Sequence, residues 1–217
     1  MSWSLNEIEG LARKAARGAG LDWGLAEEAG KATRWLCAAG WPGADLLAGL
    51  LIRNQGVAYD RIRPISTDGT WQARSGMLCP LAAGAALCDR AWDWADGQSA
   101  TLGPTAMPLL LVPYMAWSAD RTGAILNLGF QGVSITRGHG ETGVDVAEAD
   151  ALTCAAAASV ALTPVKTVTG APLRRAYRGE IGTEAARTLL DFAQKTYAPD
   201  TEQSRLSGAG AGLTDND

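Results

Sequence analysis

Apolar residues recur at helical spacing along the first fifty residues of the chain. Ser4 and Glu7 form a capping box, which predicts the start of a helix. Asp22 is placed to cap a second helix that Gly40 ends, and Pro42 opens a third. The apolar stripes of these helices consist of Leu5, Ile8, Leu11 and Ala15, then Leu25, Ala29, Ala32 and Leu36, then Leu46, Leu47, Leu50 and Leu51. The pattern predicts a compact α-helical unit.

The middle of the chain predicts one more helix and then strands. Turn residues dominate residues 54–77, and a helix is predicted from Pro80 to about residue 95, because proline is tolerated in a first turn. Residues 109–117 and 124–128 are rich in apolar residues and flank the turn sequence Asp-Arg-Thr-Gly at 120–123. This arrangement predicts a β-hairpin.

The last third of the chain mixes strand and helix patterns. Residues 133–136 and 144–146 read as short strands. Residues 149–158 are alanine-rich enough for a helix, whereas residues 159–165 alternate like a strand, so this boundary stays open. A final helix is predicted over residues 183–196, capped by Thr183.

These elements predict an α+β fold, with helices at both ends around a small, mainly antiparallel sheet. At this length we expect a single domain over residues 1–199, with a helical unit at 1–54 and an α/β part at 55–199. Residues 200–217 form a glycine-rich C-terminal tail with no predicted packed element.

Composition narrows the class of protein. The chain carries 19 basic and 23 acidic side chains, a net charge of −4, and no basic stripe, so we expect no nucleic-acid partner. Its longest apolar run, residues 106–117, is shorter than the roughly 20 residues of a membrane-spanning helix. The N-terminus lacks the pattern of a signal peptide, and the four cysteines are widely spaced, which indicates reduced thiols. We expect a cytoplasmic protein.

The string Thr-Arg-Gly-His-Gly-Glu-Thr at residues 136–142 is the most suggestive motif. With one inserted glycine, it resembles the Arg-His-Gly-Glu-Thr signature of histidine phosphatases and phosphoglycerate mutases. That family needs a second histidine, and His139 is the only histidine in the chain. We therefore reject a histidine phosphatase.

The same string remains a candidate site. His139 and Glu141 are the candidate acid–base pair, because imidazole titrates near neutral pH, and Arg137 is a candidate substrate ligand. The alternative is a solvent-exposed hairpin tip in which the glycines serve turn geometry alone.

Arg174, Arg175 and Arg178 form the densest basic segment of the chain, just before the last helix. Guanidinium groups match carboxylates and phosphates bidentately, so these residues are candidate ligands of an anionic substrate. The alternative is that they are solvated arginines on an irregular segment.

Other kinds of site have little support in the sequence. No phosphate-binding glycine loop, serine elbow or dinucleotide motif occurs, so we expect no organic cofactor, and one histidine without ligand-spaced cysteines predicts no metal. Cys79 precedes Pro80 at a predicted helix start, where the dipole would favour a thiolate, but a buried, inert thiol is the preferred interpretation.

Eight tryptophans exceed what the core requires and indicate a homo- or hetero-oligomer.

Several segments resemble a bacterial family described only as a domain of unknown function. They are Ser-Leu-Asn-Glu-Ile-Glu at 4–9, Ala-Ala-Arg-Gly-Ala-Gly at 15–20, Trp-Gly-Leu-Ala-Glu-Glu-Ala at 23–29, and the ending Gly-Ala-Gly-Ala-Gly-Leu-Thr-Asp-Asn-Asp. The resemblance implies a bacterial cytoplasmic protein and transfers no activity, catalytic residue or cofactor.

Two hypotheses about function follow. In the first, the protein is a cofactor-free hydrolase, lyase or isomerase acting on an anionic metabolite. In the second, it is a non-catalytic accessory subunit or binding protein of a bacterial metabolic enzyme complex. The position of His139 discriminates them, because an enzyme needs the imidazole inside a cleft and a subunit leaves it exposed.

Overall fold

Helix α1 begins where the sequence places its capping box. In the computed structural model, which describes residues 2–197, the Ser4 hydroxyl accepts a hydrogen bond from the Glu7 amide at 3.2 Å, and the Glu7 carboxylate accepts one from the Ser4 amide at 2.8 Å. The Asp22 carboxylate likewise caps the next helix by accepting a hydrogen bond from the Leu25 amide at 2.8 Å. Both predicted helix starts are confirmed.

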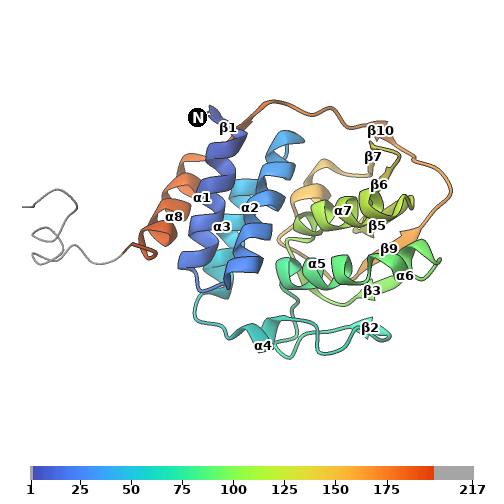
Figure 1. The fold of residues 1–217 in the computed structure, drawn as a ribbon, viewed down its shortest axis with the longest axis horizontal. Coiled ribbons are helices and arrows are strands. Elements are labelled where there is room, and N and C mark those ends of the chain that lie inside the picture. The colour runs from blue at the N-terminus through green and yellow to red at the C-terminus, as the bar shows by residue number, and fades with distance from the viewer. Residues whose placement is uncertain (1, 198–217) are drawn as a thin grey trace, which may run out of the picture.

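Four helices form the helical unit of the molecule, and one of them comes from the other end of the chain (Figure 1). They are α1 (Leu5–Gly18), α2 (Trp23–Ala38), α3 (Gly43–Asn54) and α8 (Thr183–Gln194). Helix α8 packs closely on α1 because Gly18 has no side chain, and a Cβ there would overlap the Phe192 carbonyl. The predicted cap of α8 is wrong: Gly182 is the N-cap residue and Thr183 is the first residue inside the helix. The predicted boundary at residue 54, between a helical unit and an α/β part, stays a prediction. Helix α8 comes from the predicted α/β part but packs against α1.

The strands form one main sheet and two short pairs. The seven-stranded sheet has the order β10-β7-β6-β5-β9-β3-β2 and is antiparallel throughout, except where β2 pairs with β3. Strand β1 pairs with β11, and β4 pairs with β8. The strands are β1 (Ser2–Ser4), β2 (Thr70–Trp71), β3 (Ala100–Leu102), β4 (Thr105–Ala106), β5 (Leu126–Phe130), β6 (Val133–Gly138), β7 (Glu141–Val146), β8 (Ala156–Ala157), β9 (Val160–Pro164), β10 (Ala171–Pro172) and β11 (Arg178–Glu180).

The predicted α+β class is confirmed. Strands β5, β6, β7 and β9 lie where the alternating patterns predicted strands. The segment left open resolves into a 3₁₀ turn at Ala149–Thr153, followed by β8.

The strand predicted over residues 109–117 is wrong. This run forms a 3₁₀ turn at Pro108–Leu111 and then helix α7, Val112–Thr122. Residues 109–112 and 114–116 are fully buried, so the run shows no helical periodicity, and a continuous apolar run does not distinguish a buried helix from a buried strand. The predicted hairpin turn is the end of α7, where Gly123 adopts a φ of 78° as a helix-terminating residue.

The helix predicted over residues 80–95 is divided into α5 (Pro80–Asp89) and α6 (Ala91–Ala95). The break lies at Arg90, whose guanidinium donates hydrogen bonds to the Thr67 carbonyl and, at 2.6 Å, to the Asp93 carboxylate. Within the segment expected to consist of turns, Tyr59–Ile62 forms the short helix α4.

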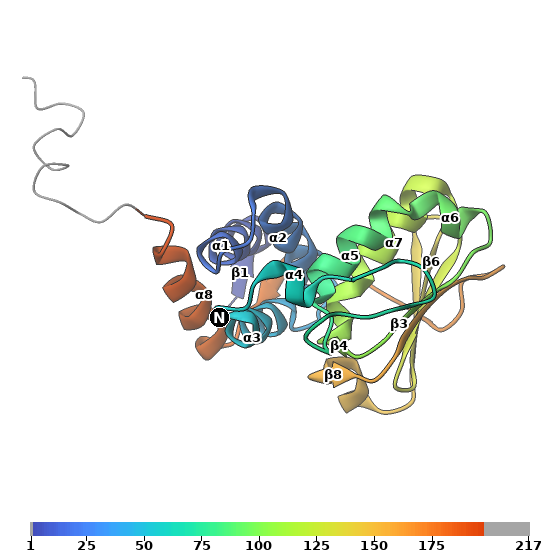
Figure 2. The same cartoon turned by 90° about the horizontal axis from the view of Figure 1, so that it is seen from below.

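Helices α5, α6 and α7 cover one face of the main sheet (Figure 2). The Tyr114 ring of α7 packs against α5 at Gly84, where a Cβ would overlap the ring. Helix α2 contacts both α5 and α7, so the helical unit and the sheet part share a packed junction.

Candidate functional site

The motif at residues 136–142 forms the tight turn between β6 and β7. Gly138 and Glu141 face each other at the end of the ladder, and His139 and Gly140 connect them with φ values of 52° and 82°. Two consecutive left-handed residues define the hairpin turn whose twist matches that of the flanking strands. His139 occupies the turn, and its side chain is exposed to solvent.

Arg137 is held rigidly beneath this turn. Its Nε and Nη2 atoms donate to the two carboxylate oxygens of Asp120 at 2.9 and 2.8 Å, which is bidentate pairing. Its Nη1 atom donates to the Gly140 carbonyl at 2.8 Å and to the Thr142 hydroxyl at 3.0 Å. The side chain is only 13% exposed. Four of the five guanidinium N–H groups are therefore engaged, and the turn is fixed to the end of α7.

Arg175 approaches the same place from the segment between β10 and β11. Its guanidinium lies over the Trp35 ring of α2, 5.5 Å from the ring centroid. Burial lowers the pKa of Arg175, and the neighbouring positive charges of Arg137 and Arg34 lower it further. No carboxylate within residues 2–197 forms an ion pair with Arg175, so its positive charge is not neutralised directly.

Arg137 and Arg175 line one hollow of about 340 Å³, which we name the arginine hollow. Glu141 also lines it, so the part of the chain that the structure describes places two positive groups and one negative group there. The remaining lining residues are Gly140, Thr142, Gly143, Val168, Gly170, Pro172 and Leu173. The structure thus brings together Arg137, Glu141 and Arg175 out of the six candidate residues.

The other three candidates lie elsewhere. His139 and Arg174 are exposed and do not line the arginine hollow. Arg178 belongs to β11, where its guanidinium donates to the Ser2 hydroxyl at 2.9 Å and to the Ser2 carbonyl at 3.0 Å. It therefore ties β1 to β11 and lines a different hollow, beside the turn between α2 and α3.

Two residues that fix the site were not among the candidates. Asp120 orients Arg137, and Trp35 supports Arg175. Asp120 was assigned to a hairpin turn, and nothing in the local sequence of Trp35 indicates its distant arginine partner.

The cysteines show no sign of activation. Cys79 is the N-cap residue of α5 but is buried, and burial raises the pKa of its thiol. Burial also raises the pKa of Cys88, to about 11. A nucleophilic cysteine needs a lowered pKa, so these environments suit structural thiols.

Residues 2–197 contain no group of three or more histidine, cysteine, aspartate and glutamate side chains placed to hold a metal ion. None of the helices described is long and apolar enough to span a membrane.

Comparison with known proteins gives a family match for part of the chain. The sequence model of a family described as a protein of unknown function, DUF3726, matches residues 3–79. This segment includes α1, α2 and α3, and the description assigns it no activity. No curated protein matches the chain.

One solved structure that aligns with this chain is malate dehydrogenase from Entamoeba histolytica. The sequences are 15% identical and the TM-score is 0.38, with 90% of this chain and 61% of that chain covered. The chain therefore spans less than two thirds of that protein's length. A TM-score this low establishes neither a common fold nor a common function.

Proposed function

We propose that this protein binds a small anionic molecule in the arginine hollow. The observation that supports the proposal is that Arg137 and Arg175 line one hollow while Arg175 has no carboxylate ion-pair partner in the described part of the chain. The positive charge of Arg175 therefore lacks a direct counter-charge, and an anion bound in the hollow would supply one.

The charges around the hollow restrict the ligand. Asp120 already neutralises Arg137, so the net positive charge comes from Arg175. Glu141 adds a negative group on the lining, which disfavours a polyphosphate and favours a carboxylate that also carries a donor such as an ammonium or hydroxyl group. A hollow of about 340 Å³ lies at the lower end of the roughly 300–1,000 Å³ of small-molecule pockets. The proposed ligand is a small amino or hydroxy carboxylate.

Binding without catalysis is the role that the site supports best. The exposed position of His139 matches the expectation for a binding protein or accessory subunit. Hydrolase, lyase or isomerase chemistry by His139 and Glu141 requires the imidazole to reach a ligand in the hollow, and His139 does not line it.

The test is isothermal titration calorimetry, in which the purified protein is titrated separately with glycine, lactate, acetate and phosphate. We expect Arg175→Gln to weaken binding of the preferred carboxylate at least tenfold, which corresponds to about 1.4 kcal/mol. Arg174→Gln is the matched control, because it removes the same charge from the adjacent residue, which does not line the hollow. Absence of binding at millimolar concentrations, or equal losses in both variants, would refute the proposal.

A second candidate function, subunit of a protein complex, is favoured by exposed tryptophans. Trp23 is 71% exposed and Trp92 is 58% exposed, and large aromatic side chains dominate protein–protein contacts. The two roles are compatible, because an accessory subunit can bind a small regulatory anion.

We also infer that the protein comes from a bacterium and is located in the cytoplasm. The chain has 15 arginines against 4 lysines and 26 glycines, a bias typical of GC-rich coding sequences. All four cysteines are free, and unpaired cysteines are typical of reducing compartments. Free-thiol titration of the protein as isolated, with four thiols expected, tests the compartment.

A further inference from the structure

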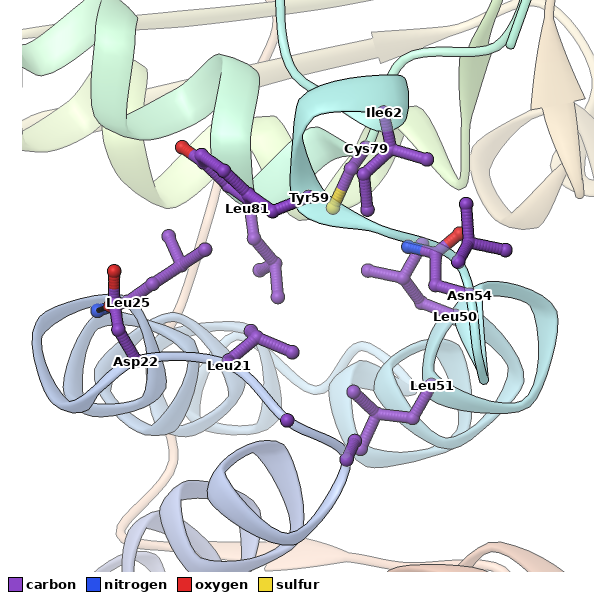
Figure 3. A pocket seen from close by; sticks show the side chains of 13 residues that line it. Leu21, Asp22, Leu25, Leu50, Leu51, Asn54, Tyr59, Ile62, Cys79 and Leu81 are labelled. Carbon is purple, nitrogen blue, oxygen red and sulfur yellow. Dashed lines mark hydrogen bonds between the residues drawn. The ribbon is translucent and has the colours of Figure 1, made fainter.

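A second cavity lies at the junction between the helical unit and the sheet part. Its walls come from the turn between α1 and α2, the end of α3, helix α4 and the start of α5 (Figure 3). The volume of the cavity is about 220 Å³. Its apolar lining consists mainly of Leu21, Leu25, Leu50, Leu51, Ile62 and Leu81.

The cavity has a buried apolar floor and an accessible edge. Leu50 and Leu81 are buried, and the sulfur of Cys79 points into the space between them and Leu21 (Figure 3). Val57 and Tyr59, which also line the cavity, are exposed. The cavity is therefore reachable from solvent beside α4, although its interior is apolar.

Besides the Cys79 thiol, the polar side chains that line this space are Asp22, Asn54 and Tyr59. Asp22 lines the cavity at its edge, but its Oδ1 atom is engaged in capping α2. The half-buried amide of Asn54 lies next to Leu50 on the opposite side (Figure 3). Among residues 2–197, no lysine, arginine or histidine lines the cavity, so its chemistry is opposite to that of the arginine hollow.

We propose that this cavity binds a small, uncharged ligand made of one apolar ring, with a single polar substituent directed to Asn54. An apolar cavity of about 150 Å³ stays dry and accommodates benzene, so 220 Å³ accommodates one ring and a small substituent. The same volume is below that of drug-sized or dinucleotide sites. Leucine side chains supply the apolar contact area. The Asn54 amide hydrogen-bonds the Cys79 thiol, and it has a second N–H donor and a carbonyl acceptor to offer the ligand.

The experiment uses toluene and phenol as probes, with ligand-observed NMR and thermal denaturation of the full chain. We expect saturable binding of both, a rise in Tm, and tighter binding of phenol. Asn54→Leu removes the polar group, so it should weaken phenol binding at least fivefold while toluene binding is retained.

Cavity-filling variants make the test specific. Cys79→Leu places a larger side chain where the sulfur now points, and it should weaken binding of both probes at least tenfold. Cys154→Leu is the matched control, since it makes the same exchange at a residue that does not line the cavity. If Cys79→Leu does not fold, Leu21→Phe fills the cavity from the turn and should have the same effect.

Failure to detect saturable binding of either probe by the wild-type protein would overturn the proposal. Undiminished binding by the folded filling variant would overturn it as well. Because the arginine hollow is lined by other residues, Arg175→Gln should leave toluene and phenol binding unchanged.

Discussion

Replacement of Tyr114 by phenylalanine should stabilise the protein. Tyr114 is fully buried in α7, with its ring against α5 and edge-on to Trp117 at a centroid distance of 5.0 Å. Within residues 2–197, its hydroxyl oxygen has no hydrogen-bond partner. Burial raises the pKa of Tyr114 well above its ordinary value, and the nearby Glu28 carboxylate adds to this effect. The hydroxyl is thus a desolvated polar group that gains no compensating bond.

The magnitude follows from the cost of such a group. A buried hydroxyl without a hydrogen bond costs about 1–3 kcal/mol. Phenylalanine keeps the ring contacts and loses the contacts of one oxygen, each worth about 0.1–0.2 kcal/mol. We therefore expect Tyr114→Phe to raise the free energy of unfolding by about 1 kcal/mol, which corresponds to roughly 2–4 °C in Tm for a protein of this size.

Urea denaturation followed by tryptophan fluorescence measures this difference. The midpoint concentration should increase while the slope m stays unchanged, because the surface exposed on unfolding is the same. Tyr177→Phe is the control: Tyr177 is 95% exposed, so its change should lie within about 0.5 kcal/mol of zero. A loss of 1 kcal/mol or more in Tyr114→Phe would show that the hydroxyl is hydrogen-bonded and that the reasoning is wrong.

Three further predictions concern stability and assembly. Burial, and then the charge of Asp89, raise the pKa of Glu28 above its ordinary 4.5. The folded state therefore binds this proton more tightly than the unfolded state does, so the free energy of unfolding falls as pH rises from 4.5 through the raised pKa. Glu28→Gln should remove this fall, which denaturation curves recorded between pH 4 and 8 measure. Gly84→Ala places a Cβ against a buried ring and should cost about 1–3 kcal/mol in the same assay, and a neutral effect would contradict the packing described. Light scattering should give a mass above 22.6 kDa for the chain alone, and the mass of a monomer after Trp23→Ser and Trp92→Ser. A monomeric wild-type chain would refute self-association, and the exposed tryptophans would then serve only a contact with a different protein.

The N-terminal helices were predictable because their signals are local. A cap needs one side chain and a backbone amide two or three residues away, as Ser4 and Asp22 show. Helix α7 was missed for the opposite reason: its first part, residues 112–116, is buried on all sides, so this stretch lacks the polar face that reveals a helix. The error also displaced Asp120 from a helix end to a turn, which hid its pairing with Arg137.

The candidate site was predictable only in part, for a similar reason. The turn at His139 follows from the glycines beside it, which are local signals. The meeting of Arg137 with Arg175 depends on β10 pairing with β7 and on the following segment crossing to α2. Adjacent arginines also differ in placement: Arg175 lies over Trp35 and lines the arginine hollow, whereas Arg174 does not line it. Sequence spacing does not contain this information.

The apolar cavity draws its walls from the helical unit and from the sheet part, whereas the residues that line the arginine hollow all lie outside the helical unit. Arg175 in the arginine hollow lies on Trp35 of α2 while Arg137 comes from β6, and the apolar cavity joins the end of α3 to the start of α5. A ligand in either site contacts residues that only the folded chain brings together, so it loses those contacts on unfolding. It therefore stabilises the folded chain by RT ln(1 + [L]/Kd), about 2.7 kcal/mol at a hundredfold excess over Kd. Binding at either site is therefore detectable through stability even when the ligand undergoes no reaction, and a rise in Tm with ligand concentration separates a binding site from an imperfectly filled hollow.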